Sequence, residues 1–114
     1  MGSADVGTRE DMAALEARAG YVAARLALMA NPSRLLILCH LIEHDASVGE
    51  LQGRIGLSQS ALSQHLARLR EAGFVATRRS AQVIYYSLAD EEARAVVRAL
   101  YAIYCAESPS APPK

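Results

Sequence analysis

The chain has 114 residues, 52% of them hydrophobic, and no net charge at pH 7 with neutral histidine. This length suits one domain, and no apolar run approaches the roughly 18 residues that a membrane-spanning helix needs. The first ten residues contain neither the apolar stretch of a secretory signal nor the hydroxyl residue of a myristoylation site, and the chain has only two cysteines. These features predict a cytoplasmic protein with no membrane partner and no disulfide framework.

Two helices are expected in the first part of the chain. Residues 1–9 are predicted to form a disordered lead, followed by a helix from Asp11 to Met29 whose alanines allow close helix packing. Asn31 and Pro32 are typical of the N-cap and first position of a second helix, expected over Ser33–His44. Because its segment SRLLILCHLIEH is apolar nearly all round, this helix should be the buried centre of the domain. On the first of these two helices, one face is predicted to carry Leu15, Ala19, Val22 and Leu26.

The stretch from Val48 to Gly73 predicts two short helices joined by a tight turn. Gly56 can end the first helix in the left-handed conformation, and Ser58 suits the N-cap of the second. Leu62, Leu66 and Leu69 recur at the spacing of one buried helical stripe. The opposite face has short or amide side chains, which can approach base edges closely. This face, here called the reading face, is Gln59, Ser60, Ser63, Gln64 and Ala67. The pattern is typical of a helix-turn-helix that binds DNA; an amphipathic hairpin with a solvated face is the alternative.

Positive charge gathers in the same region. Residues 52–87 hold five arginines and one glutamate, a local charge of +4 that the rest of the chain balances. One surface that meets phosphate would produce such a pattern. Two β-prone runs, Phe74–Arg79 and Gln82–Leu88, separated by Ser80 and Ala81, predict a hairpin wing behind the recognition helix. We expect DNA contacts from the wing and from the recognition helix, although the arginines of an ordinary ribbon would simply be solvated. The expected residues are Arg78, Arg79 and Gln82, with Arg68 in the helix.

A last helix is expected to begin at Asp90, where Glu91 and Glu92 suit the positive end of the helix dipole. Its apolar side is longer than the core of so small a domain needs, which favours a homodimer through the first and last helices. Two half-sites of an inverted repeat also require two recognition helices about 34 Å apart. The fold class is thus mainly α within α+β: five helices with a hairpin wing over residues 10–106, followed by a disordered tail over 107–114. The apolar side is Ala93, Val96, Val97, Leu100, Ile103 and Tyr104.

This order of elements resembles the ArsR/SmtB family of small dimeric winged-helix repressors, over roughly Met12 to Cys105. The segments NPSRLLILCHL, SVGELQGRIGLSQSALSQHLARLREAGFVATRR and IYYSL carry the resemblance. It implies binding to double-stranded operator DNA with an inverted repeat, and no enzymatic activity. The family senses metals and sulfur species on the same fold, so the resemblance leaves the inducer open.

The donor residues of the chain bear on that inducer. Typical metal-sensing members have a Cys-x-Cys pair at the helix-turn-helix, or His and Asp ligands on the last helix, and neither pattern is present. His40 and His44 have the i, i+4 spacing of two ligands, but on a helix Cys39 points about 100° to 140° away from them. We therefore predict no metal and no cofactor. Haem stays an alternative, with Cys and His present but no attachment motif.

By composition alone, Cys39 and Cys105 are more typical of small core hydrophobes than of reactive thiols. The resemblance changes this interpretation, because the branch typified by BigR and SqrR has one cysteine in LLILCHL and another in the last helix. That branch implies a redox switch in which one thiolate attacks the outer sulfur of a persulfide or polysulfide and the other cysteine resolves the adduct. Which cysteine attacks first stays open. The alternatives are a metal-responsive repressor, an anti-repressor similar to HlyU, and a thiol oxidoreductase, although the chain has no Cys-x-x-Cys motif.

Overall fold

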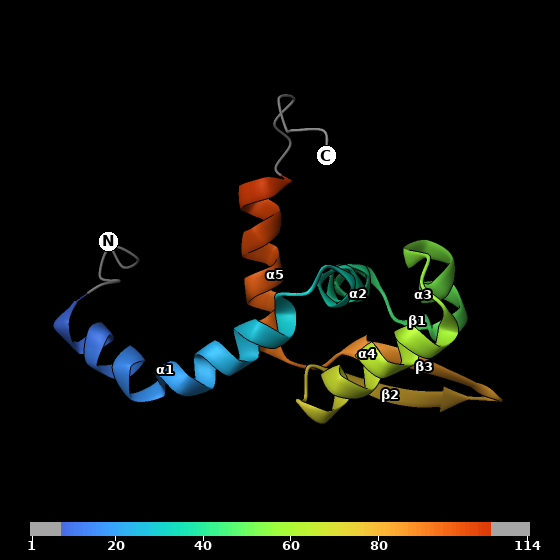
Figure 1. Ribbon diagram of the computed structural model, residues 1–114, viewed down its shortest axis with the longest axis horizontal. Helices are drawn as coiled ribbons and strands as arrows, with labels where there is room; N and C mark the ends of the chain where they lie inside the picture. The colour runs from blue at the N-terminus through green and yellow to red at the C-terminus, as the bar shows by residue number, and fades with distance from the viewer. Residues whose placement is uncertain (1–7, 106–114) are drawn as a thin grey trace.

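The computed structural model describes residues 8–105, which form five helices and a three-stranded antiparallel sheet (Figure 1). The predicted winged helix-turn-helix is confirmed: two helices precede the helix-turn-helix, the wing follows it, and a long helix ends the fold. The elements are α1 (Arg9–Met29), α2 (Pro32–Glu43), β1 (Ala46–Ser47), α3 (Val48–Ile55), α4 (Gln59–Glu71), β2 (Val75–Ser80), β3 (Val83–Leu88) and α5 (Glu91–Tyr104).

Helix α2 is the centre of the domain, as predicted, because α1, α3, α4 and α5 all pack against it. The Asn31 side chain accepts a hydrogen bond from the Arg34 backbone N–H at 3.0 Å, which caps the helix as expected. The helix is not buried all round, however. Leu36 is 48% exposed, because no other element of the single chain covers that side. The buried side of α2 is Ile37, Leu38 and Leu41.

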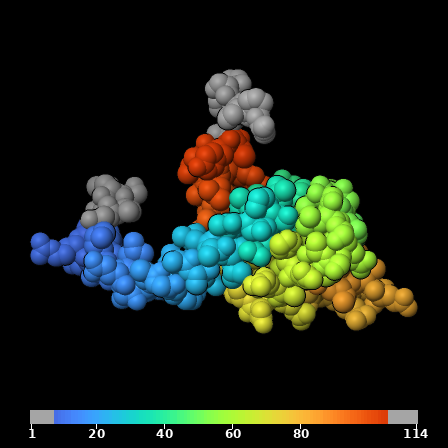
Figure 2. Space-filling model, viewed as in Figure 1, coloured from blue at the N-terminus to red at the C-terminus, as the bar shows by residue number. Residues whose placement is uncertain are grey.

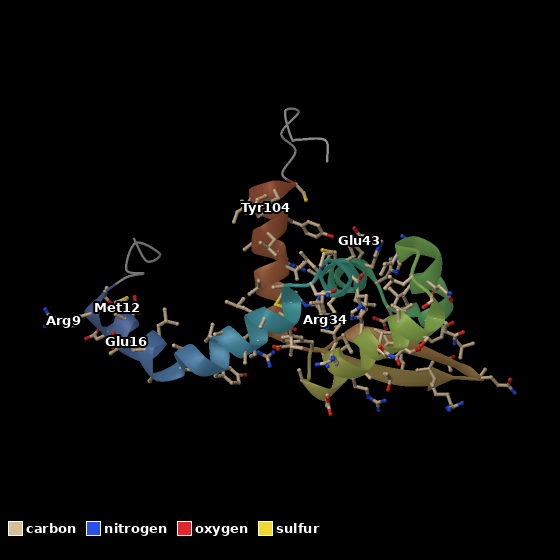
Figure 3. The ribbon with its side chains drawn as sticks, viewed as in Figure 1. Arg9, Met12, Glu16, Arg34, Glu43 and Tyr104 are labelled. Carbon is tan, nitrogen blue, oxygen red and sulfur yellow. The ribbon has the colours of Figure 1, made fainter. Side chains whose placement is uncertain are left out.

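Helix α1 begins at Arg9, two residues before the predicted start. Thr8 and Asp11 form a capping box, in which each side chain accepts a hydrogen bond from the backbone N–H of the other residue. The expected lead therefore ends earlier, and its other residues, like the expected tail, lie outside the described range. The first half of α1 projects as an arm (Figures 1 and 3) with residues 11–20 all exposed. No single described helix is long and apolar enough to cross a bilayer; α1 and α2 reach that criterion only as a pair bent by 89°.

The helix-turn-helix forms as its sequence predicts. Gly56 ends α3 in the left-handed conformation with φ of +87°, and the Ser58 hydroxyl accepts a hydrogen bond from the Ala61 backbone N–H at 3.1 Å. The end of α4 is a Schellman motif, with Gly73 at φ of +83° and the Phe74 N–H donating to the Leu69 carbonyl at 2.9 Å. These caps set where α3 ends and where α4 begins and ends.

The sheet differs from the prediction in two ways. Strand β1 was not expected, because two residues carry no readable periodicity; it pairs with β3, giving the order β1-β3-β2. The hairpin turn lies at Ala81 and Gln82, one residue later than predicted, since Ser80 pairs with Val83. Ala81 adopts a φ of +58°, a conformation that favours glycine or asparagine, so no residue signal marked the turn. Phe74, expected in the strand, precedes β2 and lies in the core.

Candidate nucleic-acid interface and paired cysteines

The reading face lies on the exposed side of α4. Its five residues are all exposed, while Leu62, Leu66 and Leu69 on the opposite side are fully buried. Arg68, one turn after Gln64, is exposed at the edge of this face. Figure 2 shows that α4 and the wing form one continuous surface at one end of the molecule. Short polar side chains thus lie beside arginines on a surface that nothing else within residues 8–105 covers.

The three predicted wing residues have different surroundings. Arg79 and Gln82 are exposed near the hairpin turn, and Arg79 has no ion pair within residues 8–105. Arg78 instead donates from Nε to Asp45 Oδ2 at 3.3 Å and lies over the Tyr85 ring, 4.8 Å from its centroid. Asp45 is 33 positions away in sequence, so only the tertiary structure could bring this carboxylate to the wing. The charge of Arg79 is therefore the more available of the two for a phosphate.

Helix α4 is also linked to α2 through a polar contact of Arg34, which Figure 3 labels. Arg34 donates from Nε to the Leu28 carbonyl at 2.6 Å, and its Nη1 lies 3.5 Å from Nδ1 of His65 on α4. Burial, followed by the positive charges of Arg34 and Arg68, lowers the pKa of His65. A neutral imidazole can accept from the Arg34 guanidinium, so this contact links the centre of the domain to the recognition helix.

Tyr101 of α5 contacts Cys39 across the packing of α2 against α5, and Cys105 follows Tyr101 by one turn of the same helix. The Tyr101 hydroxyl donates to the Cys39 carbonyl at 3.3 Å, and the Tyr101 carbonyl accepts from the Cys105 backbone N–H at 2.8 Å. Cys39 is half-buried in α2, whereas Cys105 is exposed at the C-cap of α5, and both are free thiols. The packing of α2 against α5 therefore brings both cysteines to one region. Sequence reasoning missed Tyr101, although its i, i+4 spacing from Cys105 was a usable signal.

The thiol of Cys39 has an unfavourable environment for ionisation. Burial raises the pKa of Cys39, the nearby Tyr101 hydroxyl lowers it, and the negative charges of Cys105 and Glu43 raise it further. Burial and the neighbouring Cys39 raise the pKa of Tyr101 to about 12. Tyr101 thus keeps its proton near neutral pH and can go on donating, while Cys39 is mostly a neutral thiol there.

Replacing Tyr101 by phenylalanine is expected to slow alkylation of Cys39. Loss of the hydroxyl removes the one interaction that lowers the pKa of Cys39, so the thiolate fraction at pH 8 should fall. The rate of iodoacetamide labelling measures this in a Cys105→Ser background, where only Cys39 reacts. Tyr104→Phe, an exposed tyrosine on the same helix, is the control. Equal rates for Tyr101→Phe and the parent would contradict the effect assigned to Tyr101 on the pKa of Cys39.

The histidine pair considered from sequence does not form on one helical face. Helix α2 ends at Glu43, one residue before the predicted end, and His44 has an extended backbone, with Nδ1 3.2 Å from the Asp45 carbonyl oxygen. Within the described residues, no group of three or more His, Cys, Asp or Glu side chains is arranged to hold a metal ion.

Comparison with known proteins identifies the family. The family model described as "Bacterial regulatory protein, arsR family" matches residues 31–77. The biofilm growth-associated repressor of Xylella fastidiosa strain 9a5c is 47% identical over 91% of this chain and 89% of its own length. The transcriptional activator HlyU of Vibrio cholerae is 52% identical over 70% of this chain and 74% of its own. The crystal structure of the repressor BigR from Xylella fastidiosa superposes with a TM-score of 0.78, at 48% identity, over 88% of this chain and 99% of that one. The chain therefore belongs to the arsR family of bacterial regulatory proteins.

Proposed function

We propose that this chain is a homodimeric transcriptional repressor that binds an inverted-repeat operator when its cysteines are reduced and releases it when Cys39 and Cys105 are joined through sulfur. The observation that supports the switch is the contact of Tyr101 on α5 with Cys39 on α2, one helical turn before Cys105. The repressor role is supported by the Xylella relative, which is named as a repressor and is similar over nearly the whole chain.

DNA recognition is assigned to the reading face of α4. Ser60, Ser63 and Gln64 are exposed and short enough to reach base edges, and a glutamine amide can form two hydrogen bonds with adenine. Gln59 lies at the leading edge of the helix. Arg68, Arg79 and Gln82 flank this face and suit backbone contacts, which set orientation without reading sequence. Arg78 contributes from the middle of β2, where Asp45 offsets part of its charge.

Dimerisation is assigned to α1 and α5. Leu15 on α1, and Ile103 and Tyr104 on α5, are between 52% and 69% exposed in the single chain. Apolar side chains this exposed, on two helices that project from the domain, are expected to be covered in an assembly. A groove between α1 and the start of α5 has a volume of about 310 Å³ and an apolar lining that includes Leu15, Leu26 and Val96. A second copy of the chain would fill it.

The order of the thiol chemistry is assigned from exposure. The exposed Cys105 is the accessible nucleophile: its thiolate attacks the central sulfur of an organic trisulfide, R–S–S–S–R, releasing one thiolate RS⁻ and leaving Cys105 joined through that sulfur to S–R. The Cys39 thiolate then attacks the same central sulfur and releases the second RS⁻. Both cysteine thiols lose their protons to solvent and are oxidised, while the two outer sulfurs are reduced. The product is a trisulfide between Cys39 and Cys105.

Such a bridge would connect the centre of the domain to the end of α5. A direct disulfide requires Cα atoms within about 7 Å, and an inserted sulfur relaxes that limit, which favours polysulfides over peroxide as the oxidant. A covalent tie between α2 and α5 changes how the dimer helix sits on the domain. A coupling of about 1–3 kcal/mol between this change and operator binding would alter affinity 5- to 150-fold.

Cys39→Ser and Cys105→Ser are each expected to bind operator like the parent but to ignore polysulfide. The measurement is fluorescence anisotropy with a duplex selected by the reduced protein from randomised inverted repeats, before and after treatment with an organic trisulfide. Mass spectrometry of the treated parent should find one added sulfur, with two protons lost, linking the two cysteines. If trisulfide released either variant from the operator, the two-cysteine switch would be contradicted. If the reduced parent selected no inverted repeat, the proposed repressor function would be contradicted.

Arg79→Ala is expected to weaken binding by a similar factor on every duplex and to lower the slope of log affinity against log salt by about one unit, as for one phosphate contact. Anisotropy titrations at several salt concentrations measure the slope. Arg98→Ala removes the same charge from the exposed side of α5 and should leave the slope unchanged. A slope unaltered by Arg79→Ala would put the wing away from the DNA backbone.

A second candidate function keeps DNA binding but relieves another repressor. The similarity to HlyU of Vibrio cholerae, which is named as an activator, favours it. A reporter gene behind the selected operator distinguishes the two: a repressor lowers expression without any other regulator, whereas an anti-repressor raises expression only when a second repressor is present.

A further inference from the structure

The guanidinium of Arg25, on α1, lies where three other elements meet. Its Nη1 donates to the carbonyl of Ala72, the C-cap of α4, at 3.2 Å. Its Nη2 forms an ion pair with Oδ2 of Asp90, the N-cap of α5, and its Nε is 3.9 Å from Glu92 in the first turn of that helix. The guanidinium carbon is 4.2 Å from the ring centroid of Phe74, which leads into β2. One side chain thus contacts the recognition helix, the dimer helix and the start of the wing.

Each of these contacts uses a different property of arginine. The carbonyl of Ala72 belongs to the last turn of α4, where unpaired carbonyls favour a cation. Asp90 uses its two oxygens separately, because Oδ1 accepts from the Glu92 backbone N–H at 2.9 Å while Oδ2 pairs with Arg25. The Arg25 and Asp90 side chains are 18% and 16% exposed, so water screens the pair only in part. A planar fork that also stacks on an aromatic ring can serve all these partners, and a lysine ammonium cannot.

The contacts of Arg25 matter because α4 packs little against α1 and α5 directly. Helix α2 packs closely against α1, α4 and α5, but within residues 8–105 backbone packing is slight or absent between α1 and α4 and between α4 and α5. The angle of α4 relative to α1 and α5 is therefore set by their common packing on α2 and by side chains that connect them directly, and Arg25 of α1 contacts both α4 and α5.

We propose that Arg25 is a positioning residue that sets the angle of α4 relative to α1 and α5, and thereby the separation of the two recognition helices in the dimer. The inference rests on the homodimer of the proposed function. Since half-sites follow the helical repeat of DNA, that separation decides which half-site spacing an operator must have. Arg25 would act on spacing selectivity without touching DNA.

The first test measures the separation without DNA. Ser60→Cys, combined with Cys39→Ser and Cys105→Ser, gives one spin-label site per chain at the start of α4. Pulsed electron–electron double resonance then measures the distance between the two labels of the dimer. Arg25→Met is expected to broaden and shift the distance distribution. Arg25→Lys should give an intermediate result, because it keeps the charge for Asp90 but loses the fork.

Arg94→Met is the matched control for this measurement. Arg94 is also partly buried, donates to the Leu88 carbonyl at 3.3 Å and lies 3.6 Å from Glu91, but all its partners are near it in the chain. Its substitution should leave the distribution unchanged. An unchanged distribution for Arg25→Met, an equal broadening by Arg94→Met, or the absence of any distance between two chains would each overturn the proposal. If Arg25→Met fails to fold, the lysine variant decides.

The second test uses the duplex that the reduced parent selects, with its spacer lengthened or shortened by one base pair. The parent should bind the selected duplex much more tightly than either altered spacing. In Arg25→Met this ratio of affinities should be about tenfold smaller, and in Arg94→Met it should be unchanged. Full discrimination by Arg25→Met would contradict the proposal. A parent that selects no inverted repeat refutes the proposed function instead, and the distance measurement still decides the role of Arg25.

Discussion

Replacing Leu66 by alanine is expected to lower the free energy of unfolding by about 2–5 kcal/mol, the usual cost of truncating a fully buried leucine. Leu66 lies at the middle of the buried stripe of α4, between Leu62 and Leu69, so the truncation leaves a cavity where the recognition helix packs on the domain. Denaturant unfolding followed by circular dichroism measures the loss, at one protein concentration because a dimer is more stable when concentrated.

Arg70→Ala is the control for the leucine substitution. It also creates an alanine in α4, but at an exposed position, and should change the free energy of unfolding by no more than about 0.5 kcal/mol. A Leu66→Ala protein as stable as the parent would mean that α4 is not held by its leucine stripe, and the orientation assigned to the reading face would then be wrong.

Gln64→Glu is expected to weaken operator binding by roughly 5- to 150-fold, which corresponds to about 1–3 kcal/mol for one lost base contact. The substitution is nearly isosteric, but it exchanges the amide donor for a negative charge at the centre of the reading face, where the phosphates of both strands repel it. Anisotropy with the selected duplex measures the loss, and unfolding experiments should show no comparable change because Gln64 is exposed.

The same charge change at Gln52, on α3, is the control for general electrostatic repulsion. Gln52 is half-buried and belongs to the supporting helix of the pair, so Gln52→Glu should weaken binding clearly less than Gln64→Glu. Equal losses would indicate that net charge alone governs binding, and the assignment of Gln64 to base recognition would fail.

In the proposed mechanism, both ends of α5 have a defined role. Its N-cap, Asp90, pairs with Arg25 and through it contacts the end of α4. Its C-cap, Cys105, follows Tyr101 by one helical turn, and the Tyr101 hydroxyl donates to the carbonyl of Cys39 on α2. In Figure 3, the labels Tyr104 on α5 and Glu43 on α2 mark this region. A sulfur bridge at the second end and the Arg25 contacts at the first would together connect thiol chemistry to the angle of the recognition helix.

Several parts of this fold were predictable because the signals are local. The left-handed Gly56, the Ser58 and Asn31 caps and the leucine stripe of α4 depend on residues within one or two helical turns of each other. Such patterns report backbone geometry directly, since a cap or a periodic stripe needs no distant partner. The predicted fold class and the exposed reading face follow from them.

Other parts could not be predicted for the opposite reason. Strand β1 exists because β3 offers it backbone partners, and the wing turn fell one residue later because pairing, rather than a glycine, positions it. Arg78 looked equivalent to Arg79 in sequence, but Asp45, brought near by the fold, pairs with only one of them.

The sequence by itself determined that this chain is a winged helix-turn-helix of the arsR family with an apolar centre, a polar reading face and two candidate thiols, because periodicity, capping and motif spacing are properties of neighbouring residues. Only the tertiary structure decided what those residues meet: Tyr101 beside both cysteines, Asp45 against Arg78, and Arg25 between α1, α4 and α5. The physical reason is that hydrogen bonds and ion pairs act over a few ångströms, and packing, not sequence separation, decides which side chains come within that range.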